Sequence, residues 1–423
     1  MEVSLLRGWF PVTVQVVAAV VLLVAVGWRD RRWRLRVLPV LVVVTVGLAL
    51  LAAYPGAQAV RQVDPVPFAV WFWLGAAAGA LLVLVVGWRT ARWWRRGMAV
   101  LAAALAAFAC ANGINQFVGY YPTIGAVIDD WTHAPLPGQT SLKGAVKAAG
   151  AASVPAAGKL VEVTIPATYS HFVHRHELVY LPPRWFVGHR RPVLPVVELI
   201  GGQRGGPGDW VRLGNAVQLA DGYAHDHGGY APILVFADPT GTFSNDTECV
   251  NGPRGNAADH LARDIPAYVE KTFGASRDPR QWAIAGFSMG GTCALDLTVQ
   301  YPEVFKHFVD ISGDLVPYTG TPAQTLHDLY GGNVAAQHAN EAILVMRAHG
   351  PYTGVTGQFL TSADEVRHQN EAQELSRAGA KVGIHSLVVI TPGAHTWQFA
   401  APAFATAFPW LVTQLTHPAN PHG

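Results

Sequence analysis

Residues 286–291, with the sequence Gly-Phe-Ser-Met-Gly-Gly, constrain the fold of this chain more than any other stretch. They lie between a short apolar run at 282–285 and an apolar, helix-compatible run at 292–299, an order that predicts a strand, a tight turn and a helix. A side chain on either flanking position of such a turn would collide with the adjoining strand or helix, so glycine is needed at both. We therefore expect the Ser288 hydroxyl to be exposed above the edge of a sheet.

The first quarter of the chain is far more apolar than the rest. The whole sequence of 423 residues is 51% hydrophobic and only 14% charged, and the excess is concentrated before residue 119. A single apolar stretch there would fit a buried core helix or a signal peptide, but four in succession predict a transmembrane domain at 1–118. The four stretches are 9–28, 37–54, 67–88 and 97–118.

The loops between these stretches differ in charge. Those at 29–36 and 89–96 are rich in arginine, whereas the loop at 55–66 has only Arg61 against Asp64. Because positively charged loops stay in the cytoplasm, the N-terminus and everything after residue 118 should lie outside it. Nucleic-acid binding is a rival explanation of the arginines, but their position between apolar spans favours topology, and a net charge of +2 indicates no polyanionic partner.

After a linker rich in Ala, Gly and Pro, expected at 119–158, apolar runs alternate with helical segments over 159–423. This alternation predicts an α/β domain with a mostly parallel sheet of about eight strands, and Ser288 falls at the carboxyl end of the fifth, as in the α/β-hydrolase fold. The expected strands are 161–166, 177–181, 194–200, 232–237, 282–285, 307–311, 343–346 and 384–390. The expected helices are 210–221, 257–273, 289–300, 325–330, 363–378 and 399–415.

Two further groups are expected beside Ser288. His395 directly follows the last expected strand, where an imidazole can take the serine proton. The backbone N–H groups of Met289 and Gln203 are expected to form an oxyanion hole, with Gly202 as the alternative to Gln203, because the glycine-rich loop at 201–206 follows the third strand.

The acid of a Ser-His-acid triad is harder to place. No carboxylate follows the strand expected at 343–346, where the acid of this fold ordinarily lies. We rank Asp364 first, Asp314 second and Glu365 third. Asp364 and Glu365 stand at the start of an expected helix, where acids are also common as partners of the helix dipole.

Three cysteines are present. Cys110 lies in an apolar stretch and is expected to be a packing residue. Cys249 and Cys293 lie on neighbouring elements near Ser288, and in an oxidising compartment they suggest a disulfide, the alternative being two buried thiols. No paired C-x-x-C or H-E-x-x-H spacing occurs, so we expect neither a metal nor a cofactor.

The stretches 264–269, 286–292, 301–305 and 392–397 resemble an esterase family of α/β-hydrolases that includes S-formylglutathione hydrolases and actinobacterial mycolyltransferases. The resemblance covers about 160–416, and the four apolar stretches resemble those of membrane-anchored actinobacterial members. It implies that Ser288 is acylated, that His395 is the base and that Gln203 and Met289 form the oxyanion hole. It also puts Arg204 in the place of an arginine beside the sugar site of mycolyltransferases.

Two departures from this family pattern matter. The acid is missing from its expected place, and mycolyltransferases usually have a leucine before the serine, where this chain has Phe287. We expect a multi-pass membrane protein whose catalytic domain, outside the cytoplasm, is a serine esterase or acyltransferase acting on an ester or acyl-lipid substrate of the cell envelope. The alternative is a non-catalytic envelope interaction protein with a degenerate hydrolase fold. The sequence does not specify the oligomeric state.

Overall fold

The structure is a computed structural model that describes residues 3–27, 30–59, 67–89, 91–132, 134–188, 190–203 and 205–416. The chain divides into two compact units, Met1–Ala134 and Pro135–Gly423.

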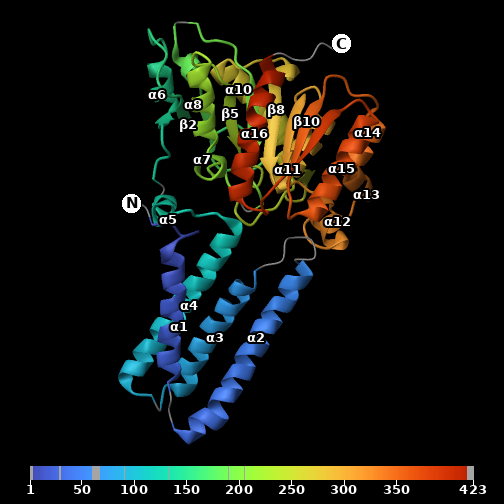
Figure 1. Ribbon diagram of the computed structural model, residues 1–423. Helices are drawn as coiled ribbons and strands as arrows, with labels where there is room; N and C mark the ends of the chain where they lie inside the picture. Colours follow the sequence, from blue (N-terminus) through green and yellow to red (C-terminus); the bar gives the residue numbers. More distant parts are fainter. Residues whose placement is uncertain are drawn as a thin grey trace. The chain divides into compact units, whose positions relative to one another are not determined.

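The first unit contains the four long helices expected from the apolar stretches (Figure 1). All four are long and apolar enough to cross a membrane. Small side chains such as Ala18, Ala106 and Ala109 pack between them, whereas large apolar side chains such as Val43 and Val85 are exposed on the outer surface. This unit comprises α1 (Trp9–Val26), η1 (Trp33–Val37), α2 (Leu38–Ala59), α3 (Phe68–Gly87), α4 (Trp93–Val118) and the short α5 (Ile124–Trp131).

The N-terminal segment lies against the residues that follow α4. The Leu5 N–H donates a hydrogen bond to the Pro122 carbonyl at 2.9 Å, and the Asn112 side chain donates to the Leu5 carbonyl at 3.0 Å. Both ends of this helical unit therefore emerge at the same end of the bundle.

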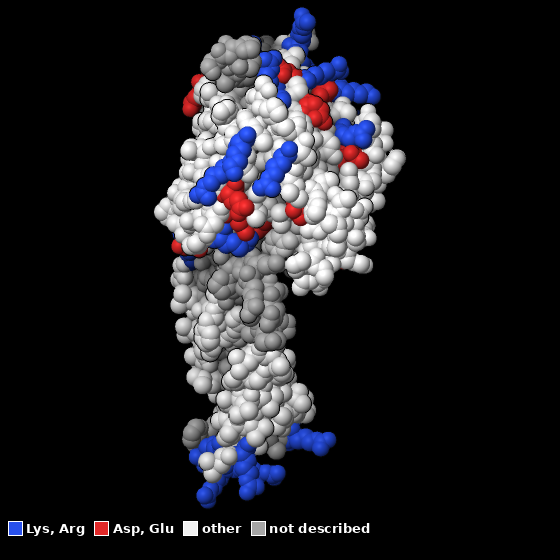
Figure 2. Space-filling model, turned by 90° about the vertical axis from the view of Figure 1, so that its right-hand side faces the viewer, with Lys and Arg blue, Asp and Glu red and all other residues white. Residues whose placement is uncertain are grey.

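Positive side chains gather at one end of the four helices (Figure 2). They belong to the connections between α1 and α2 and between α3 and α4, and Arg31, Arg32 and Arg92 are exposed there. The connection between α2 and α3 at 60–66, with Arg61 and Asp64, lies outside the described residues.

The second unit is built on one large sheet (Figure 1). Within the described residues the sheet has nine strands in the order β1-β2-β3-β5-β4-β8-β9-β10-β11, all neighbours being parallel except β2–β3 and β3–β5. The strands are β1 (Gln139–Ser141), β2 (Lys159–Val163), β3 (Glu177–Leu181), β4 (Val196–Ile200), β5 (Ile233–Ala237), β8 (Trp282–Phe287), β9 (His307–Ile311), β10 (Thr356–Ser362) and β11 (His385–Thr391). A separate hairpin joins β6 (Asn251–Gly252) to β7 (Gly255–Asn256).

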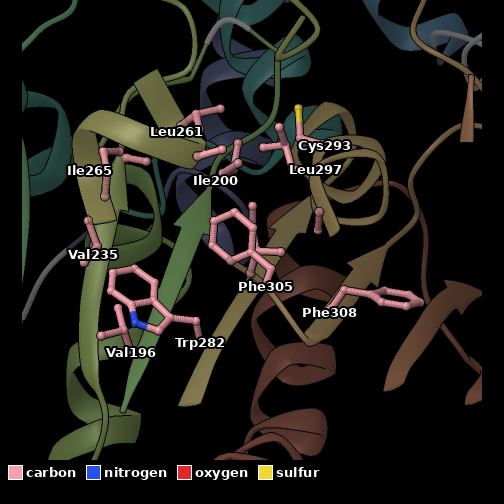
Figure 3. Close-up of a cluster of buried hydrophobic side chains, with 14 of the residues drawn as sticks. Val196, Ile200, Val235, Leu261, Ile265, Trp282, Cys293, Leu297, Phe305 and Phe308 are labelled. Carbon is pink, nitrogen blue, oxygen red and sulfur yellow. The ribbon is translucent and has the colours of Figure 1, made fainter. Parts of the chain in front are cut away.

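Helices cover both faces of the sheet and bury an apolar core on each. On one face, Val196 and Trp282 of the sheet pack with Leu261, Ile265 and Leu297 from the covering helices (Figure 3). On the other face α7, α8 and α16 enclose a second core. The remaining elements are α6 (Leu142–Ala148), η3 (Pro183–Phe186), α7 (Asp209–Arg212), α8 (Ala216–Asp226), α9 (Ala257–Asp259), η4 (His260–Asp264), α10 (Ile265–Phe273), η5 (Pro279–Gln281), α11 (Met289–Gln300), α12 (Pro322–Tyr330), α13 (Val334–His338), α14 (Ala342–His349), α15 (Val366–Ala380) and α16 (Trp397–Thr416).

Two elements differ from those expected. The apolar run at 343–346, expected as the seventh strand, lies within α14, and the strand between β9 and β11 is β10 instead. The stretch at 119–158, expected as a linker, contains α5, β1 and α6, and β1 extends the sheet by pairing with β2. The first difference changes which residues form the seventh strand of the hydrolase order, and the acid of this fold ordinarily follows that strand.

Candidate active site

Ser288 stands in the turn between β8 and α11, as the glycine pattern predicts. Its backbone has φ 59° and ψ −124°, a conformation with positive φ that residues other than glycine rarely adopt. The Ser288 N–H donates to the Ile311 carbonyl of β9 at 2.8 Å, which ties the turn to the next strand. A Cβ on Gly290 would collide with the Ile200 carbonyl of β4, so the helix reaches the sheet only because glycine stands there.

His395 follows β11 and reaches Ser288 from the neighbouring loop. The Ser288 hydroxyl donates to His395 Nε2 at 2.8 Å, and His395 Nδ1 donates to Glu365 Oε1 at 2.5 Å. The imidazole side chain is mostly enclosed, with 18% of its surface exposed, and its ring packs against Phe287 with 4.9 Å between ring centroids. Ser288, His395 and Glu365 thus form one continuous chain of hydrogen bonds.

The carboxylate that contacts His395 belongs to Glu365, ranked third among the three candidates. Asp364, ranked first, is exposed, whereas Glu365 is buried and lies three residues after β10. The strand that precedes both residues is β10, not 343–346, and of the two only the Glu365 side chain is buried toward His395. Glu365 therefore occupies the place after the seventh of the eight hydrolase strands, because β1 is an addition to the edge.

Glu365 accepts further hydrogen bonds that fix both of its oxygens. Oε2 accepts from the Ser312 hydroxyl at 2.7 Å, and Oε1 also faces His368 Nδ1 at 2.8 Å. Burial alone would raise the pKa of Glu365, but the hydrogen bonds from His368 and His395 outweigh it and hold this pKa below its usual range. The group is therefore a carboxylate at neutral pH.

Asp314, the second candidate, belongs to the same network without touching His395. It accepts from Arg367 Nη1 at 2.6 Å and lies 3.3 Å from His368 Nε2, which Arg367 Nη2 also approaches at 2.7 Å. Burial disfavours the charged imidazole, yet the carboxylates of Asp314 and Glu365 prevail and raise the pKa of His368 to about 9. Asp314 is thus separated from His395 by the His368 ring.

Of the residues expected to form the oxyanion hole, Met289 and Gly202 lie beside Ser288. Met289 is the first residue of α11, and a Cβ on Gly202 would lie 3.6 Å from the Ser288 Cβ, so the loop before Gln203 runs beside the serine. Among the described residues, the backbone N–H groups of Met289 and Gln203 donate no hydrogen bond. Arg204, expected as a substrate-binding residue, lies outside the described residues.

Cys249 and Cys293 are bonded to each other as a disulfide. Both are buried, and the bond joins the loop after β5 to α11, the helix that begins directly after Ser288. Cys110 is buried within α4 with its thiol free.

Among the described residues, three groups of side chains have the atom types of a metal site, but in each of them atoms that would bind a metal already form hydrogen bonds. Glu365, His368 and His395 are one such group, and a metal there would displace the bond between His395 and Glu365. In the second group, Asp314, His368 and Glu371, the Arg367 guanidinium donates to both carboxylates. The third group comprises His174, Glu177 and His260. Both ring nitrogens of His174 contact backbone carbonyls at 2.8 Å, which leaves no lone pair for a metal.

A serine, a histidine and a carboxylate joined in this order, at the carboxyl end of a mostly parallel sheet, define the class: the fold is that of the α/β-hydrolases. The family model described as "Putative esterase" matches residues 174–411. An uncharacterized protein of Corynebacterium glutamicum is 31% identical over 366 residues, covering 82% of each chain. The chain belongs to this esterase family.

Solved structures of two bacterial proteins are similar to the second unit. The S-formylglutathione hydrolase of Agrobacterium tumefaciens aligns with a TM-score of 0.49 and 16% identity, covering 62% of this chain and 97% of that chain. MPT51 of Mycobacterium tuberculosis aligns with a TM-score of 0.44 and 17% identity, covering 60% of this chain and 97% of that chain.

Proposed function

We propose that this protein is a membrane-anchored serine esterase or acyltransferase that works through an acyl-enzyme on Ser288, with its catalytic unit outside the cytoplasm. The observation that carries the proposal is the hydrogen-bonded chain from Ser288 through His395 to the buried carboxylate of Glu365. A serine held at positive φ with a histidine on its hydroxyl and a carboxylate behind the histidine is an arrangement that supports nucleophilic acyl transfer.

In the first half of the reaction the Ser288 oxygen attacks the ester carbonyl while His395 Nε2 takes the serine proton. Glu365 orients the ring and stabilises the resulting imidazolium. The N–H groups of Met289 and Gln203 receive the negative charge on the carbonyl oxygen. When the tetrahedral intermediate collapses, the bond from carbon to the alcohol oxygen breaks, and the alcohol leaves with the proton from His395.

In the second half an acceptor hydroxyl attacks the acyl-enzyme and His395 takes its proton. If the acceptor is water, the product is a carboxylic acid and the enzyme is an esterase. If it is an alcohol such as a sugar hydroxyl, the product is a new ester and the enzyme is an acyltransferase. Both outcomes return the proton to Ser288.

The membrane part of the proposal is supported by the first unit. Its four helices are long and apolar enough to span a bilayer, and the arginines of the connections between α1 and α2 and between α3 and α4 gather at one end of the bundle. The other end carries both the segment around Leu5 and the exit from α4 near Pro122. With arginine-rich loops in the cytoplasm, the chain leaves the membrane on the outer side. A catalytic unit tethered there would meet esters of lipids or sugars in the cell envelope.

Hydrolysis of p-nitrophenyl butyrate by the full chain in detergent tests the proposal. We expect Ser288→Ala to reduce kcat/KM to background, a loss of at least about 10³-fold, because the nucleophile is gone. The exposed Ser153 provides the matched control, and Ser153→Ala should keep the wild-type rate. Full activity in the Ser288→Ala variant would refute the nucleophile, and a folded wild-type chain with no activity would favour a binding protein.

A further inference from the structure

The side chain of Gln203 is held by a carboxyl group that the reaction described above does not use. Its Nε2 donates a hydrogen bond to Oδ2 of Asp246, which is buried in the loop after β5. The loop that contains Gln203 has two glycines on either side of Gln203 and Arg204, so its backbone has little stiffness of its own. Arg175 donates to the Gly205 carbonyl at 2.8 Å and the Gly206 N–H donates to Asp209 at 3.0 Å, so the far end of this loop is held separately. The hydrogen bond to Asp246 adds a side-chain attachment at Gln203 itself.

A second carboxyl group lies close to Asp246 in the same loop. Burial, together with the charge of Asp246, raises the pKa of Glu248 well above its usual range and so favours its neutral form. Burial also raises the pKa of Asp246, and the hydrogen bond from Gln203 opposes that rise. Arg254 holds the same residue from another side by donating to the Asp246 carbonyl at 2.7 Å.

The loop that carries Asp246 is anchored to the helix that carries the other oxyanion donor. Glu248 and Cys249 are consecutive residues in the left-handed region, with φ of 49° and 55°, a conformation that persists only where the surroundings enforce it. The disulfide from Cys249 to Cys293 bonds this loop to α11, whose first residue is Met289. The loop at 246–249 thus connects Gln203 to the helix that begins at Met289. It does so through the hydrogen bond of Asp246 at one end and the disulfide of Cys249 at the other.

We propose that Asp246 is a positioning residue of the oxyanion hole, which sets the Gln203 N–H at a fixed distance from the Met289 N–H. The inference rests on the proposed function, because it needs an oxyanion at Ser288. Donors that are aimed at the developing charge act mainly in the transition state, so a loosened loop slows the chemical step without weakening substrate binding.

Steady-state kinetics of the full chain in detergent with p-nitrophenyl butyrate test this role. We expect Asp246→Ala to lower kcat by about 10- to 100-fold with little change in KM, which is less than the loss of a whole oxyanion donor. Asp246→Asn should stay within about three-fold of wild type, because its amide oxygen can accept the same hydrogen bond. Asp226→Ala, at an exposed acid on α8, is the matched control and should leave the rate unchanged.

A double-mutant cycle separates positioning from general destabilisation. Gln203→Met removes the side-chain donor but keeps the backbone N–H, so Asp246→Ala should cost little more in that background. Wild-type kcat in Asp246→Ala, or additive losses in the double variant, would overturn the inference while Ser288-dependent hydrolysis still upholds the proposed function. Absence of Ser288-dependent hydrolysis in the wild type would overturn both. If Asp246→Ala does not fold, a loss of kcat of about 10- to 100-fold at constant KM in Gln203→Met, with Asp246→Asn within about three-fold of wild type, supports the inference. A loss confined to KM in Gln203→Met contradicts it.

Discussion

At the scale of single residues, the ring of His395 is oriented by Glu365 and by nothing else of opposite charge in direct contact among the described side chains. The carboxylate is itself fixed by the Ser312 hydroxyl and by His368, so it cannot rotate away from the ring. A neighbour in sequence cannot replace it, because Asp364 is exposed.

Paired amide substitutions test this assignment. Glu365→Gln should lower kcat by about 10³- to 10⁴-fold, since an amide in this position no longer stabilises the imidazolium and can favour the wrong tautomer. Asp364→Asn should retain wild-type kcat, and it is the matched control because it makes the same chemical change one residue away. Ester hydrolysis at pH 7 measures both, and a larger loss in Asp364→Asn than in Glu365→Gln would contradict the account.

At the scale of elements, the disulfide joins a strained loop to the helix behind the nucleophile. Cys249 and Cys293 are 44 residues apart in sequence, and closing a loop of that length restricts the unfolded chain considerably. Both sulfur atoms belong to buried side chains, so the bond is also part of the packed core.

Replacing both cysteines by alanine should lower the free energy of unfolding of the second unit by about 4 kcal/mol at 25 °C. Thermal melting followed by circular dichroism, with and without a reductant, measures the effect. The Cys110→Ala variant is the matched control and should respond to reductant as the wild type does. An unchanged melting temperature in the double alanine variant would show that the bond does not stabilise this unit.

Most of the elements could be predicted from sequence, and the exceptions have physical causes. The tight turn at Ser288 could be predicted from the glycines at 286 and 290, and the long helices of the first unit could be predicted from uninterrupted apolar runs. The apolar run in α14 has the composition of a buried strand. In so short a segment the spacing of apolar residues cannot distinguish a strand from a helix. β10 contains Gln358 and Thr361, so its sequence lacks the continuous apolar run that predicts a buried strand.

The place of the acid depends on the same strand. Asp364 and Glu365 both lie within three residues of the end of β10, so a correct assignment of that strand would have favoured both over Asp314. Only the folded chain distinguishes the two, because it buries Glu365 and exposes Asp364. The contributions of His368, Ser312 and Asp246 could not be predicted, because each depends on loops that meet only in the folded chain.

At the scale of the whole molecule, the proposed function requires Ser288 to lie on the outer side of the membrane. The loops around Arg31 and Arg92 are rich in arginine, and this positive charge favours a cytoplasmic location for them. A chain that crosses the membrane four times then returns to the outer side, where the unit containing Ser288 would reach substrates that do not enter the cell.

A charged fluorophosphonate that cannot cross membranes tests this central claim directly. The full chain and its Ser288→Ala variant are labelled in sealed protoplasts of an expression host and, separately, after detergent lysis, and the adduct is measured by intact mass. We expect one adduct on the wild type under both conditions and none on Ser288→Ala. Labelling of the wild type only after lysis would contradict the outward orientation, and no labelling of a folded wild type in either condition would contradict an activated serine at Ser288.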